Sequence, residues 1–150
     1  MITQLALDPA FGSTIGRGIG AIALYAVVGL LLMVVGFYAI DFTTPGQLSS
    51  LVRTGKPNAV IVTAAGLFSM ALIIVVAIYS SEGKLTEGLL YSLIFGFVGI
   101  IVQVVAVRLL EWVTRLDIGR LIESETFAPA SVVVASAHVA LGLVVAVAIS

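Results

Sequence analysis

The sequence contains no cysteine and few charged side chains. The lack of cysteine excludes disulfide bonds, thiolate metal sites and cysteine nucleophiles. Soluble domains carry about 25% charged residues, whereas charged residues make up 10% of this 150-residue chain. The formal net charge is −1, so no excess of positive charge is present. The composition therefore excludes a soluble domain, a disordered chain and a protein that binds nucleic acid by basic excess.

Apolar residues take the place of the missing charges. They make up 61% of the chain, and the mean hydropathy is +1.24. Four segments contain no Asp, Glu, Lys or Arg, namely 18–40, 58–80, 88–107 and 128–150. Each meets the ~20 residues that a helix needs to cross a hydrocarbon core of ~30 Å. Their apolar runs do not alternate as barrel strands do. The sequence predicts an all-α membrane protein with four transmembrane helices in the lipid bilayer.

The distribution of Lys and Arg predicts the orientation of these helices. Residues 1–17, the loop between the second and third spans and the C-terminus contain two basic residues, Arg17 and Lys84. The loops after the first and third spans contain five. Because basic residues stay on the cytoplasmic side, we expect these two loops in the cytoplasm and both termini outside. Residues 1–17 are apolar enough to form a lead on the membrane surface.

The chain contains a tandem repeat of two spans. Residues 18–80 align without gaps with residues 88–150, at a shift of 70 residues, with 11 identities in 63 pairs. The pair Asp41-Phe42 aligns with Glu111-Trp112, so an acid and an aromatic residue follow both odd-numbered spans. A copy with two spans returns to its starting side of the membrane. We therefore expect two parallel two-helix repeats, 18–80 and 88–150, related by a pseudo-twofold axis along the membrane normal.

The loop inside each copy also contains a helix signal. Thr44 and Pro45 are typical of an N-cap and a first helical position, and Gln47 completes a capping box. Apolar residues follow in both copies: Leu48, Leu51 and Val52, then Leu116, Leu121 and Ile122. We predict short amphipathic helices at the cytoplasmic interface. Plain connecting loops are the alternative.

These features resemble the YjfL-like bacterial inner-membrane family of unknown function. The residues that carry the resemblance are Gly55-Lys56-Pro57-Asn58-Ala59 and Gly66 in the first copy. The second copy has Glu125–Ala130, Ser136 and Gly142 at the matching places, with Ala128 where the family pattern has a second Asn. The resemblance implies a multi-pass protein of the bacterial plasma membrane. It implies no established activity, cofactor or catalytic residue.

Gln103 and His138 are the most polar side chains deep inside the predicted spans. His138 lies nine residues beyond Pro129 and Gln103 six residues before Leu109, so their predicted depths are roughly 13 and 9 Å from the same side. Their counterparts in the first copy are Met33 and Phe68, both apolar. Two polar groups in lipid can satisfy each other. We therefore predict a Gln103–His138 hydrogen bond that joins the third and fourth spans, with a proton-relay or ligand role as the alternative.

Other polar residues in the spans have simpler interpretations. Thr63, Ser69, Ser92 and Ser131 are expected to bond to carbonyls of their own helices. Asp41 and Glu111 end two helices, where the helix dipole disfavours a negative charge. We expect nearby basic residues to compensate them: Arg53, Lys56 and Arg115. The alternative is a symmetric pair of acids that faces a cation vestibule.

Small residues recur at helical spacing along the chain. We expect eight glycines to support close helix packing, either within the chain or with a partner: Gly12, Gly16, Gly20, Gly29, Gly36, Gly96, Gly99 and Gly142. No phosphate-binding loop or nucleophile–base pair is evident, and one His without a second ligand is a poor metal site. We therefore expect no enzymatic activity, cofactor or metal.

Two functions remain open from the sequence. The first is a non-enzymatic scaffold or accessory subunit that packs its helices against itself, as a homo-oligomer, or against a larger membrane complex. The second is a small channel or permease for an ion or small solute along the pseudo-twofold axis. The second has the repeat in its favour but lacks charged residues within the spans to line a pore.

Overall fold

Six helices form the part of the chain that the structure, a computed structural model, describes, residues 10–43 and 47–150. Four are long: α1 (Phe11–Thr43), α3 (Pro57–Tyr79), α4 (Leu85–Thr114) and α6 (Ala130–Ala148). All four are long and apolar enough to cross a membrane. The all-helical membrane architecture predicted from the sequence is therefore confirmed.

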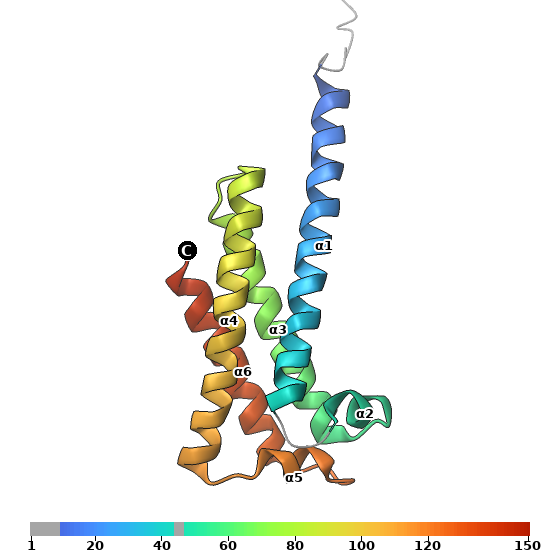
Figure 1. The fold of residues 1–150 in the computed structure, drawn as a ribbon, viewed down its shortest axis with the longest axis vertical. Coiled ribbons are helices and arrows are strands. Elements are labelled where there is room, and N and C mark those ends of the chain that lie inside the picture. The colour runs from blue at the N-terminus through green and yellow to red at the C-terminus, as the bar shows by residue number, and fades with distance from the viewer. Residues whose placement is uncertain (1–9, 44–46) are drawn as a thin grey trace, which may run out of the picture.

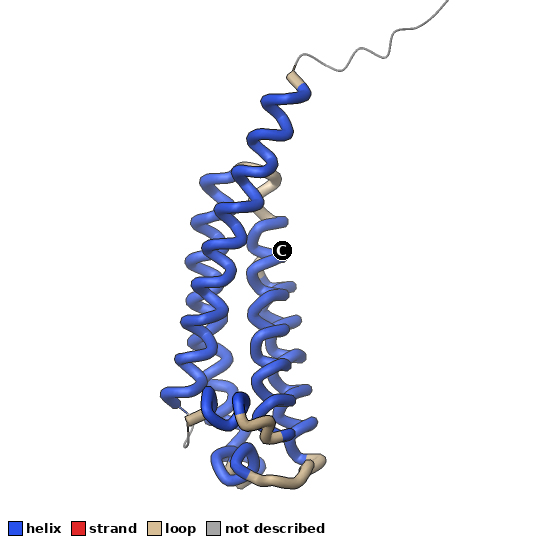
Figure 2. Tube along the Cα trace, turned by 90° about the vertical axis from the view of Figure 1, so that its right-hand side faces the viewer, coloured by secondary structure: helices blue, strands red, loops and turns tan. Residues whose placement is uncertain are grey.

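The two copies run in the same direction. α1 and α4 start at one end of the bundle, α3 and α6 start at the other, and the helices lie side by side (Figure 1). Two short helices, α2 (Leu48–Arg53) and α5 (Ile118–Glu123), lie at the same end, as Figure 2 also shows. Each copy is thus a long helix, a short helix and a second long helix, as expected for parallel repeats.

The first helix includes residues that the sequence assigned to a surface lead. α1 begins at Phe11 and runs without a break through Arg17. With 33 residues it is roughly 50 Å long, and its N-terminal end projects beyond α3 and α4 (Figure 1). Residues 11–17 are therefore the first turns of a long helix. The rest of the predicted lead, residues 1–9, lies outside the described residues.

The short helices pack on the base of the bundle. Leu48 of α2 and both Ile118 and Ile122 of α5 are buried, in one cluster with Val62 of α3 and Val134 of α6. α2 begins at Leu48 with Gln47 as its N-cap, whereas the predicted start at Thr44 and Pro45 lies outside the described residues. In α5 the carboxylate of Asp117 caps the helix by accepting from the Arg120 amide at 3.0 Å. The sequence analysis overlooked this residue, although Asp before an apolar run is a helix-start signal.

The expected pseudo-twofold axis is wrong. α3 and α4 pack on each other, and each also contacts both α1 and α6. A twofold axis would repeat the α3–α4 contact as an equal contact between α6 and α1. Among the described residues no such extended contact joins α1 to α6. The second repeat is displaced sideways from the first, so α1 and α6 are the outer helices of the bundle.

Candidate functional site

A closed ring of hydrogen bonds joins α3, α4 and α6 inside the bundle. The His138 Nδ1 lies 3.3 Å from Gln103 Oε1, and because an amide oxygen only accepts, the ring nitrogen donates. Gln103 Nε2 donates to the Ser69 hydroxyl at 3.0 Å, and this hydroxyl donates to the His138 carbonyl at 2.8 Å. All three residues are at most 3% exposed. The Gln103–His138 contact predicted from the sequence is therefore present.

Ser69 is the member of this ring that the sequence analysis misplaced. It bonds to a neighbouring helix and not, as expected, to its own. Ser92 follows the expectation, because its hydroxyl donates to the Gly88 carbonyl of the same helix at 2.7 Å, whereas Ser131 donates backward to the Ala128 carbonyl, just before the start of α6, at 2.8 Å. A serine that bonds across helices has the same local pattern as one that bonds backward. The sequence alone therefore carried no signal that separates Ser69 from the other two.

Two buried polar atoms near the ring have no hydrogen-bond partner among the described residues, His138 Nε2 and Thr63 Oγ1. A cavity lined by Gln103, Ala106 and His138 has room of about 10 Å³, close to the volume that one water molecule occupies. No group of three His, Asp or Glu side chains in the described part of the chain is placed to hold a metal ion. The chemistry available here is hydrogen bonding between helices.

The helix-end acids bond to the short helices that follow them. Asp41 accepts from the Ser49 amide at 3.4 Å, and Glu111 accepts from the Ile118 amide at 3.3 Å. Glu111 also pairs with Arg108 at 2.5 Å. Unpaired amides at a helix N-terminus favour negative charge, so each acid supports the start of a short helix. The expected compensation of Glu111 by Arg115 is wrong, because Arg108 takes that place; Arg115 is the left-handed C-cap of α4, with φ of 56°.

The two copies are joined at their base by Asn58 and Lys56. The Asn58 side chain is fully buried; it donates to the Thr126 carbonyl at 2.8 Å and accepts from the Ala128 amide at 2.9 Å. Lys56 forms an ion pair with Glu125 in the same loop. Lys56 was expected to compensate Asp41, and this expectation is wrong. Ala128 stands at the place of the second Asn, and its backbone is the partner of the first.

Five of the eight predicted glycines lie at helix contacts. A Cβ at Gly96 would lie 2.7 Å from Leu32, and one at Gly99 would lie 2.7 Å from Ile73. At Gly142 it would lie 2.9 Å from the Ser69 Cβ and 3.0 Å from its Cα, and at Gly36 3.5 Å from Met70. Gly29 only reaches ordinary contact, 4.0 Å from Ile74.

The other three glycines face open space within the chain. A Cβ built at Gly12, Gly16 or Gly20 meets nothing within 4 Å. The sequence analysis also missed two close approaches. A Cβ at Gly66 would lie 3.2 Å from Ile40, and one at Gly88 would overlap the Tyr25 hydroxyl. Spacing thus identified small residues but not which of them the fold brings against a neighbour.

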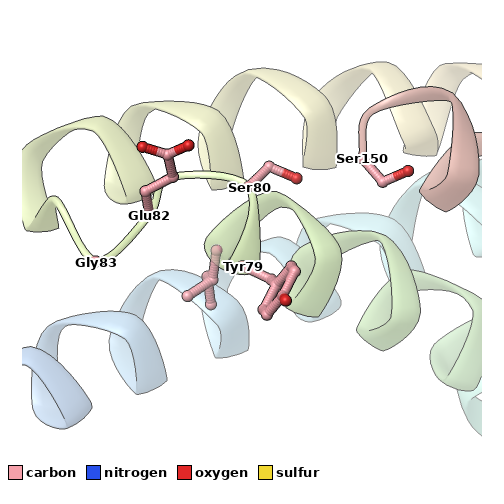
Figure 3. A pocket seen from close by; sticks show the side chains of 6 residues that line it. Tyr79, Ser80, Glu82, Gly83 and Ser150 are labelled. Carbon is pink, nitrogen blue, oxygen red and sulfur yellow. The ribbon is translucent and has the colours of Figure 1, made fainter.

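A cavity of about 580 Å³ lies at the other end of α3, opposite α2 and α5. Tyr79, Ser80, Glu82 and Ser150 line it (Figure 3). The Ser80 hydroxyl donates to the Ile149 carbonyl at 3.0 Å, so this end of α3 is tied to the C-terminus. Ser80 lies eleven residues beyond Ser69, roughly 16 Å along the helix. The cavity is therefore separate from the ring of hydrogen bonds.

The second long helices of the two copies bury opposite faces. Gly66, Ser69, Met70 and Ile73 of α3 are buried, whereas their counterparts Ser136, Val139, Ala140 and Leu143 of α6 are exposed or half-buried. Conversely His138 is 3% exposed, and its counterpart Phe68 is 56% exposed. The exposed face of α6, together with Ala65 of α3, lines a groove of about 380 Å³. A face that holds neighbouring helices in the first copy is therefore uncovered in the second.

Comparison with known proteins places the chain in a family. The family model described as "Domain of Unknown Function (DUF350)" matches residues 14–149. A UPF0719 transmembrane protein of Mycolicibacterium paratuberculosis is 35% identical over 135 residues, which cover 89% of each chain. A UPF0719 transmembrane protein of Mycobacterium bovis is 36% identical over 81 residues, 53% of each chain. No solved structure matches. The chain belongs to the DUF350 family of transmembrane proteins, whose function is unknown.

Proposed function

We propose that the chain is a non-enzymatic component of the bacterial plasma membrane that acts by packing its helices against the helices of other protein chains. The preferred partner is a second copy of the same chain. The observation that carries this proposal is the uncovered face of α6, since the equivalent face of α3 is buried. Between helices in lipid, association depends on close van der Waals contact and on small residues. The groove on α6 includes Ala135, Ser136 and Ala140, which allow such contact.

The polar groups of the spans support a packing role. The ring of Ser69, Gln103 and His138 bonds helix to helix, and Asn58 bonds one copy to the other. The channel or permease alternative rested on a pseudo-twofold axis, which the contacts of α3 and α4 remove. The cavity beside Gln103 has room for about one water molecule. The narrower assignment to the YjfL-like group stays a prediction.

The test is the mass of the purified protein in lipid nanodiscs. We expect the wild type to have at least twice the mass of one chain, 15.5 kDa, or to form a stable complex with a second protein. Ala140→Trp fills the groove and should release the single chain. Val144→Trp is the matched control, because Val144 lies on the same helix at 65% exposure, outside the groove. A wild type that is monomeric at every concentration contradicts the proposal, and ion flux through protein-containing liposomes would favour the channel.

A further inference from the structure

The second repeat packs against the first through the contact between α3 and α6. Gly66 and Ser69 of α3 form a hollow for α6, because the His138 ring lies 3.9 Å from a Cβ built at Gly66. Gly142 of α6 lies directly against Ser69. The two helices are parallel and nearly in register, since the hydrogen bonds along them join residues 68 to 70 positions apart. The second long helix of a repeat therefore has two faces of different kinds. The face at Gly66 and Ser69 accepts a neighbouring helix and is called the hollow. The face at His138 and Gly142 packs into it and is called the projection.

The second repeat carries the same hollow, unfilled. The counterparts of Gly66 and Ser69 are Ser136 and Val139, and both line the groove of about 380 Å³ together with Ala140, while Ala65 of α3 borders it. Ser136 and Ala140 are exposed. Ser136 and Ala140 are small, whereas Val139 is larger than its counterpart Ser69.

The first repeat carries the matching projection, and the fold covers it only in part. The counterparts of His138 and Gly142 are Phe68 and Leu72. Phe68 is 56% exposed and Leu72 is half-buried. Because α6 already occupies the hollow of α3, and the projection lies on α3 itself, this chain cannot bring Phe68 to its own Ser136. A second copy can.

We propose that Phe68 and Leu72 on α3 of a second copy dock in the α6 groove at Ser136 and Val139. The interface repeats the α3–α6 contact between two molecules, and it rests on the proposed function of self-association. The α3 and α6 helices are parallel within the chain (Figure 1). The two molecules would therefore share one orientation in the membrane, as chains inserted by the same rules must.

Such an interface joins different faces of the two copies. It is heterologous, and heterologous contacts build rings when the rotation closes and open rows when it does not. α6 is an outer helix of the bundle, and on α3 the exposed Phe68 marks the face that a second copy can reach. A face-to-face dimer, in which two α6 grooves meet about a twofold axis, would leave Phe68 uncovered.

Cysteine cross-linking tests the pairing, because the natural chain has no cysteine. Within the α3–α6 contact, Ser69 lies close to Gly142, with 3.0 Å between the Ser69 Cα and a Cβ built at Gly142. Its intermolecular counterpart is Val139 with Leu72. Chains with Val139→Cys and chains with Leu72→Cys carry different tags, are expressed together and are oxidised in the membrane. Val144→Cys with Leu72→Cys is the matched control, since Val144 lies outside the groove.

The expected result is a disulfide-linked dimer with both tags, at least tenfold above the Val144→Cys control, and little dimer from either variant expressed alone. A linked dimer from Val139→Cys alone would show that α6 grooves meet each other. A multimeric wild type without any Val139–Leu72 link would place association on another surface. Both results overturn the proposed docking of α3 in the α6 groove of another copy, and both leave the proposal of self-association intact. A monomeric wild type without cross-links overturns both proposals.

Discussion

At the scale of single residues, the membrane interior makes each polar side chain depend on a partner. An unsatisfied polar group in an apolar environment is costly, and the chain meets this constraint with a ring of three hydrogen bonds from Ser69, Gln103 and His138. The same positions in the first copy, Met33 and Phe68, need no partner. The two polar residues are therefore expected to depend on each other more than on the rest of the bundle.

Gln103→Met and His138→Phe should be coupled in their effect on stability. Each single change leaves one polar group of the ring without its partner, whereas the double change removes both. We expect a coupling free energy of order 0.5–1.5 kcal/mol, the range found for hydrogen bonds between membrane helices. A double-mutant cycle on unfolding in detergent measures it. Additive effects of the two changes would mean that this hydrogen bond does not contribute to stability.

At the scale of helices, close approach determines which glycines matter. Gly96, Gly99 and Gly142 each lie against a side chain of another helix, whereas Gly12, Gly16 and Gly20 do not within the chain. The helix-end acids act at this scale too, because Asp41 and Glu111 accept amides at the starts of α2 and α5. Helix ends and helix crossings thus depend on a few small or acidic residues.

Gly142→Ala should destabilise the bundle, because the new methyl group would overlap Ser69 and force α6 away from α3. We expect a loss of about 1–3 kcal/mol, typical of overpacking. Gly20→Ala is the matched control: the site is open, and Ala is a better helix former by up to about 1 kcal/mol. Thermal unfolding in detergent compares the two variants. Equal melting temperatures would show that α3 and α6 are farther apart than described.

At the scale of the whole molecule, both short helices and their basic residues lie at one end. Arg53, Lys56, Arg115 and Arg120 belong to the segments that connect the long helices at the α2–α5 end, and Arg108 lies in the last two turns of α4 at the same end. The C-terminus lies at the other side of the bundle (Figure 1). Because basic residues favour the cytoplasm, we expect the α2–α5 end of the bundle in the cytoplasm and the C-terminus outside.

A reporter fused after Ser150 tests this orientation. A fluorescent protein that matures only in the cytoplasm should stay dark there, and an alkaline phosphatase that is active only outside should be active. Fusion after Lys56, in the loop between α2 and α3, should give the opposite pattern. A bright fluorescent fusion at Ser150 would reverse the predicted topology.

The sequence by itself determined the spans, the repeat and one polar contact. Long apolar segments in a chain with 10% charge have no stable alternative to membrane helices. The shift of 70 residues brings the copies into register. Two apolar residues of the first copy, Met33 and Phe68, are both replaced by polar residues in the second, and this indicated that Gln103 and His138 are in contact. These inferences hold because hydropathy acts along each segment by itself, and because a polar group inside the bilayer needs a polar partner at its own depth.

The tertiary structure decided how the copies sit together. Apolar surface can face lipid or protein at similar cost, so the sequence could not show which face of α3 or α6 is buried. For the same reason it predicted a twofold axis where the second repeat is displaced sideways. The partner of Ser69 and the uncovered groove at Ser136 follow from this displacement, and Gly12, Gly16 and Gly20 are open because the start of α1 projects beyond the bundle. Neither could be read from the sequence, because helix packing in lipid is set by shape and not by hydrophobicity.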